Sequence, residues 1–106
     1  MIQPAEIECI AQRLASATNA EQVILFGSYA RGDAREDSDV DLMIIAPSDL
    51  PRFKRSRPLY SLFQPYPFAM DLLVYTPEEL ERGKQSSVSF VSTVIREGKV
   101  LYVRQS

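Results

Sequence analysis

The chain has 106 residues, the usual size of one domain and enough to bury a single core without disulfides. Its composition, 45% hydrophobic and 25% charged with a formal net charge of -2, is that of a globular protein and excludes the disordered and fibrous classes. No apolar run approaches the roughly 20 residues of a membrane span, and no basic stretch with an apolar signal core begins the chain. We therefore expect one cytoplasmic domain over residues 1–106, with no membrane contact.

The absence of histidine narrows the chemistry that the side chains can perform. It excludes serine–histidine triads, cysteine–histidine dyads and ordinary zinc sites, so catalysis must depend on carboxylates, a metal ion, or both. The single cysteine, Cys9, cannot form an internal disulfide. Because it lies in an apolar helical pattern, we expect a packed thiol rather than a nucleophile.

The first third of the chain predicts a helix followed by a strand. Apolar residues at helical spacing over residues 4–18, with a proline in the first turn, predict an amphipathic helix that Asn19 closes. The continuous apolar run of residues 23–26 is typical of a buried strand, and it stops at Gly27. A brief helical turn is expected over residues 29–34.

The middle of the chain predicts two further strands with a loop between them. Residues 40–46 form a second apolar run that Pro47 ends, and residues 68–75 indicate a third strand. Residues 47–67 are rich in proline, arginine and serine, which predicts a loop around one short helix. The apolar face of that helix would consist of Leu59, Leu62 and Phe63.

The last third predicts two helices and a strand. Residues 76–79 supply a helix cap, a first-turn proline and a capping-box glutamate, so a short helix begins there. A second helix would end at Gly98, and residues 100–103 can add a last strand. The apolar face of this second helix would consist of Val88, Val91, Val94 and Ile95. We therefore expect an α/β (α+β) fold with a mixed sheet of three or four strands flanked by helices.

Two aspartates begin the second predicted strand. Because side chains alternate along a strand, Asp39 and Asp41 project close together from one face, while Val40 points into the core. Two like charges that close repel, and a divalent cation between them removes the repulsion. Magnesium prefers oxygen ligands and typically binds only one or two protein carboxylates, with water and substrate phosphates completing its shell. The pair therefore predicts a magnesium site.

A third aspartate, Asp71, lies early in the third predicted strand, within an apolar sequence. A carboxylate buried there is costly unless it is paired or binds a metal. If this strand lies beside the strand that follows Asp39, the three acids converge into a centre that can hold two metal ions for phosphoryl transfer. The alternative is an acid on an edge strand that water partly solvates.

The turn after the first strand offers groups that can bind phosphate. Gly27 lets the backbone approach a phosphate closely, Ser28 offers its hydroxyl, and the next amides point toward an anion. Arg31, one turn further on, could reach a phosphate oxygen or pair with Asp33 or Asp37. A Gly-Ser turn alone, or an Asp-x-Asp loop end alone, has an ordinary structural explanation. Their combination at this spacing predicts a nucleotide site.

The segments 27–34 and 38–42 resemble the signature of the minimal nucleotidyltransferases of the DNA polymerase β superfamily. The order of strands, helices and acids agrees with that family, and residues 96–102 resemble the end of these small domains. The resemblance implies a polymerase-β-like nucleotidyltransferase core with two Mg²⁺ ions and ATP as substrate. The implied metal ligands and catalytic residues are Asp39, Asp41 and Asp71, the last of which helps to activate the acceptor hydroxyl. The implied triphosphate-binding residues are Gly27 and Ser28.

The resemblance also implies an activity and a partner. Small domains of this type are commonly encoded with a helical HEPN-domain protein as a toxin–antitoxin pair. The nucleotidyltransferase is the antitoxin, which transfers AMP from ATP to a hydroxyl of the HEPN ribonuclease, and the two can form a hetero-oligomer. Larger relatives hold the base and the acceptor with a further helical domain, so we expect another molecule to supply those contacts here.

Two other functions remain open at this level. A nucleotide-binding module could neutralise a partner by masking it without turnover, and transfer to a small molecule such as an aminoglycoside is the third choice. The segment 52–57 could dock an acidic partner or RNA, or could be a solvated loop. Because the overall balance of charge is acidic, direct nucleic-acid binding is the weaker of these functions. The basic residues of the segment are Arg52, Lys54, Arg55 and Arg57.

Overall fold

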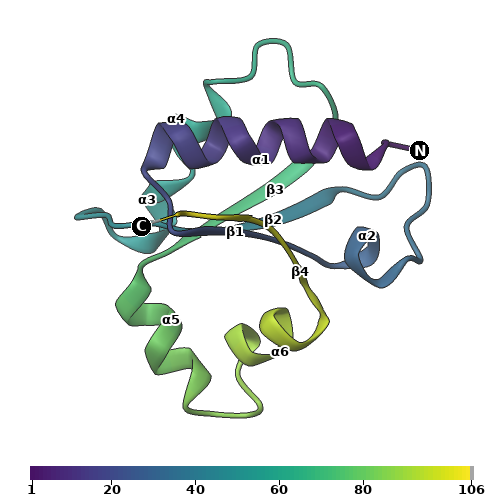
Figure 1. Ribbon diagram of the computed structural model, residues 1–106. Coiled ribbons are helices and arrows are strands. Elements are labelled where there is room, and N and C mark those ends of the chain that lie inside the picture. Colours follow the sequence, from purple (N-terminus) through teal and green to yellow (C-terminus); the bar gives the residue numbers. More distant parts are fainter. Residues whose placement is uncertain (106) are drawn as a thin grey trace.

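The computed structural model describes residues 1–105, which form a four-stranded sheet with helices on both faces (Figure 1). Strand β1 pairs antiparallel with β2 and with β4, whereas β2 and β3 are parallel, so the sheet is mixed, as predicted. The strand order is β3-β2-β1-β4. The elements are α1 Pro4–Thr18, β1 Gln22–Phe26, α2 Ser28–Arg31, β2 Val40–Ile45, α3 Arg52–Arg55, α4 Arg57–Tyr60, β3 Met70–Tyr75, α5 Pro77–Lys84, α6 Phe90–Glu97 and β4 Lys99–Val103.

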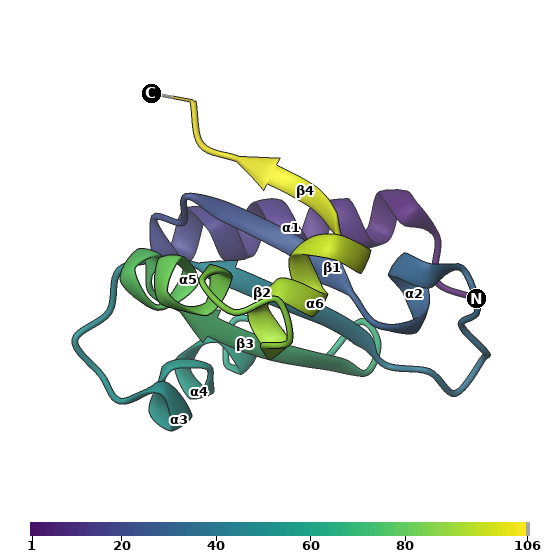
Figure 2. The ribbon, with the colours of Figure 1, turned by 90° about the horizontal axis from the view of Figure 1, so that it is seen from below.

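Strand β2 is buried on both faces because its residues alternate between two layers of helices. Leu42 and Ile44 belong to the core that α1 covers, whereas Met43 and Ile45 pack with α5 and α6. Figure 2 shows α5 and α6 together on their side of the sheet. All four side chains are at most 1% exposed. The strand that carries Asp41 is therefore held firmly from both sides.

Helix α1 lies across the other face of the sheet. Asn19 closes it in the left-handed conformation with φ of 55°, and its amide donates to the Ala15 carbonyl, as the sequence predicts. Cys9 is exposed, so the prediction of a packed thiol was wrong. Two residues correspond to about 200° around a helix, which places Cys9 opposite Ile7. The buried face of α1 consists of Ile7, Ile10, Ala11, Leu14 and Ala15.

The segment between β2 and β3 contains two single-turn helices, α3 and α4, where the sequence predicts one short helix. Pro58 lies in the first turn of α4 and lacks the amide that would continue a preceding helix, so the chain starts a new turn there. Leu59 and Phe63 are buried, but Leu62 is 40% exposed. The predicted apolar face is therefore correct for two of its three residues.

Strand β3 is one edge of the sheet, and the preceding segment covers part of that edge. The Leu72 amide donates to Tyr60 Oη at 2.9 Å, and Arg55 Nη1 donates to the Val74 carbonyl at 3.2 Å. These side chains occupy backbone groups that an additional strand would need. They also hold β3, and with it Asp71, in place beside β2.

Helices α5 and α6 follow β3. Thr76 and Glu79 form the predicted capping box of α5, with hydrogen bonds of 3.2 and 2.9 Å. Ser89 caps α6, so Val88 precedes that helix and is 89% exposed. The prediction of Val88 as part of the apolar face was wrong, because the Ser89 cap makes the helix begin at Phe90, after Val88. Ile95 is 42% exposed, so it does not belong to the buried face either.

Helix α6 ends at Gly98 and β4 follows at once, both as predicted. None of the helices within residues 1–105 combines the length and the apolar character that crossing a membrane requires.

Candidate functional site

Asp41 and Asp71 lie side by side on the parallel strands β2 and β3, where they are paired in register. Asp39 precedes β2, and the alternation of the strand places it on the face of Asp41. The condition for the acids to converge, that the third strand lies beside the second, is therefore met. Asp71 is exposed on the edge strand, so the argument that its burial would be costly was wrong. The register alone brings it to the other acids.

The electrostatic environment of Asp41 reflects this grouping. Partial burial raises the pKa of the Asp41 carboxyl above its ordinary value, and the negative charges of Asp71 and Asp39 raise it further. Arg31 acts in the opposite direction. No group of three acidic or thiol side chains within residues 1–105 is already arranged to hold a metal ion. The three aspartates are thus electrostatically coupled neighbours, and their role as ligands stays a prediction.

Gly27 brings the backbone directly against Asp41. Its φ of 74° and ψ of -155° belong to a region that only glycine occupies readily. A Cβ built on Gly27 would overlap the Asp41 Oδ2 atom. The Gly27 carbonyl accepts the amides of Ala30 and Arg31 at 3.1 and 3.0 Å, which starts the single turn of α2. The first amides of such a turn have no partner within it.

Arg31 ends α2 and pairs with two acids. Its Nε donates to Asp33 Oδ2 at 3.3 Å, and its Nη1 lies 3.9 Å from Glu97 Oε1 on α6. Within residues 1–105, Asp33 and Glu97 are its ion-pair partners, and Asp37 is not among them. The sequence offered Asp33 as an alternative and did not suggest Glu97.

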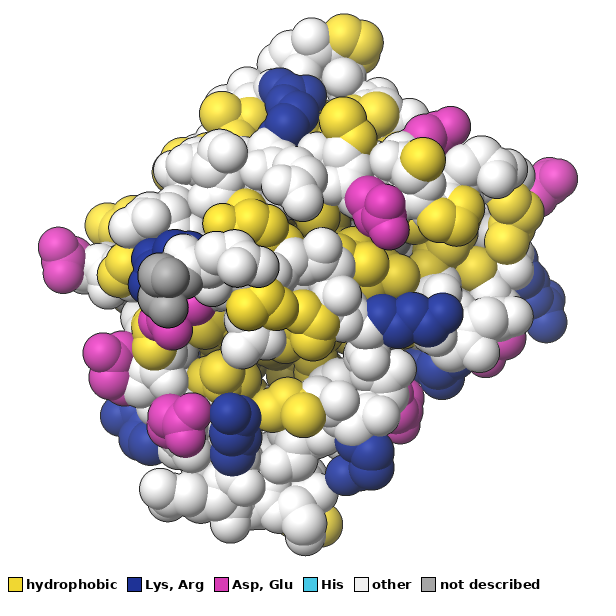
Figure 3. All heavy atoms as spheres, in the orientation of Figure 1, with side chains coloured by type: hydrophobic (Ala, Val, Ile, Leu, Met, Phe, Trp, Pro, Cys, Tyr) yellow, Lys and Arg dark blue, Asp and Glu magenta, His cyan; other side chains and the backbone are white. Residues whose placement is uncertain are grey.

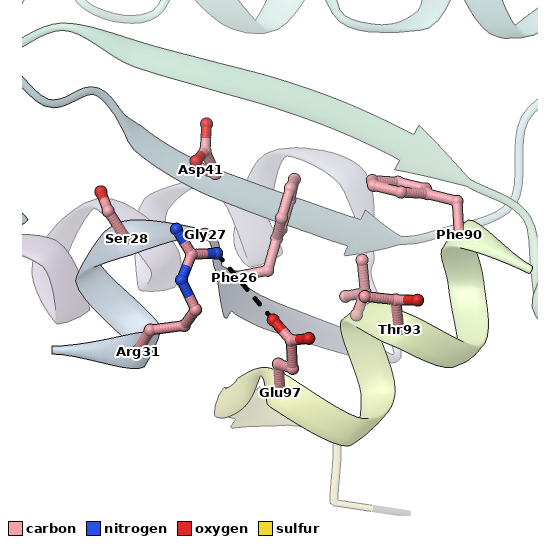
Figure 4. A pocket seen from close by; sticks show the side chains of 9 residues that line it. Phe26, Gly27, Ser28, Arg31, Asp41, Phe90, Thr93 and Glu97 are labelled. Atoms are coloured by element: carbon pink, nitrogen blue, oxygen red, sulfur yellow. Dashed lines mark ion pairs between the residues drawn. The ribbon is translucent and has the colours of Figure 1, made fainter. Parts of the chain in front are cut away.

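A pocket of about 360 Å³ opens between the turn at Gly27 and Ser28, which is the predicted phosphate-binding turn, and α6 (Figure 4). Gly27, Ser28, Arg31 and Asp41 contribute one wall, and α6 contributes the other. The side chains of α6 in this wall are Phe90, Thr93, Val94 and Glu97.

The α6 wall is the part of the site that sequence reasoning missed. Phe90, Thr93 and Glu97 are spaced by three and four residues, which is the spacing of one helix face. This periodic signal was present in the sequence. It could not show which element the face lies against, because the contact depends on the docking of α6 against β1.

The basic segment 52–57 is partly absorbed into the fold. Arg55 Nη1 lies 2.6 Å from Glu79 Oε1, and Arg52 Nε lies 3.8 Å from Glu79 Oε2. The guanidinium of Arg52 also stacks over the ring of Tyr75 at 4.7 Å. Figure 3 shows basic and acidic side chains interspersed on the face of that view. Two of the four basic residues therefore stabilise the structure, which neither the docking-patch nor the solvated-loop prediction anticipated.

A family match and the similarity to individual proteins both identify this chain as a nucleotidyltransferase domain. The family described as "Nucleotidyltransferase domain" matches residues 7–105. "Putative protein adenylyltransferase MJ0604" of Methanocaldococcus jannaschii is 37% identical over 83 residues, 77% of this chain and 78% of that protein. "Putative protein adenylyltransferase MJ0141" of the same organism is 41% identical over 54 residues, 51% of this chain and 54% of that protein. The second match thus spans about half the length of that relative.

Solved structures share the fold. A chain in the crystal structure of a toxin-antitoxin with AMP-PNP has a TM-score of 0.58 and 26% identity, over 92% of this chain and 74% of that chain. The crystal structure of "a putative nucleotidyltransferase from Sulfolobus solfataricus" has a TM-score of 0.63 and 24% identity, over 92% and 78%. The family match over almost the whole chain, together with this shared architecture, shows that the chain belongs to the nucleotidyltransferase domain family and is a nucleotidyltransferase of the polymerase-β-like fold.

Proposed function

We propose that this nucleotidyltransferase transfers AMP from ATP to a hydroxyl of a partner protein and thereby acts as the antitoxin of a HEPN-domain toxin. The observation that carries the proposal is the pairing of Asp41 with Asp71 on adjacent strands, directly against Gly27. Carboxylates beside a phosphate-binding turn are the groups that nucleotidyl transfer needs. The similarity to proteins named as protein adenylyltransferases supports a protein as the acceptor.

In this proposal the nucleotide occupies the pocket between α2 and α6. Gly27 allows the triphosphate to approach the backbone, and Ser28 donates its hydroxyl to a phosphate oxygen. Arg31 supplies the positive charge, since its side chain lines the pocket while Nε is held by Asp33. The solved toxin-antitoxin structure with AMP-PNP, which is similar to this chain, supports ATP as the donor.

The acidic residues fit a divalent cation in the kind of ligand that they offer. All three donors, Asp39, Asp41 and Asp71, are carboxylates, which magnesium prefers. Partial burial and the charges of Asp71 and Asp39 raise the pKa of Asp41. The space in which a Cβ of Gly27 would collide with Asp41 is kept open by the glycine. A bound Mg²⁺ would offset the negative charge of the carboxylates and phosphates and of the attacking and leaving oxygens.

The reaction is an in-line displacement at the α-phosphorus of ATP. The acceptor oxygen forms a new bond to phosphorus, the bond to the bridging oxygen of the β-phosphate breaks, and pyrophosphate leaves. Asp71, which is exposed at the open edge of the sheet, accepts the proton of the acceptor hydroxyl. Because the protein performs little covalent chemistry, positioning and electrostatic stabilisation account for most of the acceleration.

Intact-mass analysis tests this function directly. The proposed HEPN-domain toxin is incubated with the chain, ATP and MgCl₂, and we expect the mass of the toxin to rise by one or more AMP units. The matched control is Asp41→Asn, which should produce no shift. If the wild type binds ATP in calorimetry and inhibits the toxin without any mass shift, the protein acts by masking instead.

A further inference from the structure

The ion pair between Arg31 and Glu97 joins the two walls of the pocket. Glu97 lies 66 positions later in the chain than Arg31, and both side chains contribute to the pocket lining. Figure 4 shows the carboxylate and the guanidinium pointing toward one another. Because Asp33 holds Arg31 Nε, a second acid near Nη1 fixes the direction of the guanidinium plane.

The position of Glu97 in its own helix is unfavourable. It is the last residue of α6, where the negative end of the helix dipole disfavours a carboxylate. The side chains of Glu97 and Arg31 are 42% and 47% exposed, so burial does not force the contact. This unfavourable interaction with the helix dipole is offset when the Glu97 carboxylate interacts with a positive group outside the helix, here Arg31.

Arg31 also has a competing partner in the pocket. Arg31 and Asp41 both line the pocket, so their opposite charges face the same cavity. A guanidinium without a second anchor would be drawn toward Asp41, Asp39 and Asp71, whose charges repel one another. Such a contact would occupy the carboxylates that the proposed function assigns to the metal.

We propose that Glu97 is a positioning residue, which holds the Arg31 guanidinium over the phosphate-binding turn and away from Asp41. The inference rests on the proposed function, because it assigns to Arg31 the phosphates of the nucleotide. Glu97 itself does not touch the nucleotide's reacting atoms. Its effect on binding is therefore transmitted entirely through Arg31.

A double-mutant cycle on nucleotide binding tests this dependence. Binding of the α,β-methylene analogue of ATP, which cannot be cleaved at the α-phosphate, is measured by calorimetry in MgCl₂. We expect Glu97→Gln to raise the Kd about fivefold and Arg31→Gln to raise it tenfold or more. In the Arg31→Gln background, adding Glu97→Gln should change the Kd by less than about twofold. The Mg²⁺ concentration that gives half-maximal binding of the analogue should rise in the Glu97→Gln single variant and not in the variants that lack Arg31.

Controls separate positioning from a structural effect. Glu81→Gln removes a surface carboxylate that pairs with Lys84 outside the pocket and should leave the Kd unchanged. In the transfer assay, Glu97→Gln should raise KM for ATP and leave kcat nearly unchanged. An equal loss of binding in both backgrounds, or no loss in the wild-type background, would overturn the inference. If the wild type binds the analogue but transfers no AMP, the proposed function fails while the binding cycle still decides the role of Glu97. Absence of binding by the wild type would overturn both.

Discussion

Gly27 and Asp41 are in such close contact that a side chain on the first would displace the carboxylate of the second. We therefore expect Gly27→Ala to abolish nucleotide binding in calorimetry and to lower the free energy of unfolding by about 1–3 kcal/mol, since alanine is strained at this backbone conformation. Gly32→Ala is the matched control. Gly32 also has a positive φ, of 85°, but a Cβ there meets nothing within 4 Å. The Gly32→Ala variant should lose a similar amount of stability and keep nucleotide binding. Equal nucleotide binding by Gly27→Ala and Gly32→Ala would contradict this account.

Asp39→Asn, Asp41→Asn and Asp71→Asn should each abolish AMP transfer without unfolding the chain. Asp41→Asn should even raise the melting temperature by a few degrees, because it removes a charge that burial and two neighbouring acids disfavour. Asp37→Asn, an exposed acid outside the proposed ligand set, is the control and should retain activity. Calorimetric melting and the mass assay give the two readouts. Transfer that survives Asp41→Asn would contradict the assignment of that carboxylate.

The pH dependence of stability should reflect Glu79. The hydrogen bond from Arg55 lowers the pKa of Glu79 to about 2 from its ordinary 4.5. Because the pKa is lower in the folded state, the stabilisation is complete above pH 4.5 and is lost as the pH falls toward 2. The full shift corresponds to about 3 kcal/mol, and solvent screening near the surface reduces our expectation to about 1–2 kcal/mol.

Urea unfolding of Glu79→Gln and wild type between pH 7 and pH 2.5 measures this contribution. The variant should be less stable at neutral pH, and the difference should shrink below pH 4.5. Glu78→Gln removes an exposed acid from the same turn of α5 and should not change the pH profile. A difference between Glu79→Gln and wild type that stays constant down to pH 2.5 would rule out this source of stability.

Gly83→Ala should be destabilising although Gly83 lies inside helix α5. Alanine is favoured over glycine in a helix by about 1 kcal/mol. A Cβ at this position, however, would lie 2.6 Å from the Val91 Cβ of α6, and overpacking of this kind costs about 1–3 kcal/mol. We expect the clash to outweigh the gain in helix propensity, so that Gly83→Ala unfolds at a lower denaturant concentration than the wild type. In a Val91→Gly background, which removes that Cβ, the sign should reverse. A stabilising Gly83→Ala in the wild type would show that α5 and α6 can move apart without cost.

Much of the framework could be predicted because its signals are local. The apolar runs of β1 and β2, the capping residues Thr76 and Glu79, and the turn at Gly27 depend on neighbours within a few positions. The approach of Asp71 to Asp41 followed from the sequence only on the condition that the two strands are neighbours, which the pairing of β2 with β3 meets. These features place the acidic side of the site.

The other side of the site depends on packing that no local signal describes. Glu97 and Phe90 reach the pocket because α6 docks on the face of the sheet opposite α1, and Arg55 is withdrawn from the surface by Glu79. Helical spacing shows which side chains share a face but leaves the rotation of that face open. Cys9 is a different case, because it lies about 200° around α1 from Ile7 and therefore off the apolar face that helical spacing identifies.

The two walls of the pocket differ in how firmly they are anchored. Asp41 lies on a central strand with five fully buried side chains, whereas α6 buries only Val91 and Val94. Opening free energies follow buried apolar contact, so the amide protons of α6 should exchange with solvent deuterium well before those of β2. We therefore expect Asp41 to keep its position and any opening of the pocket to come from movement of α6.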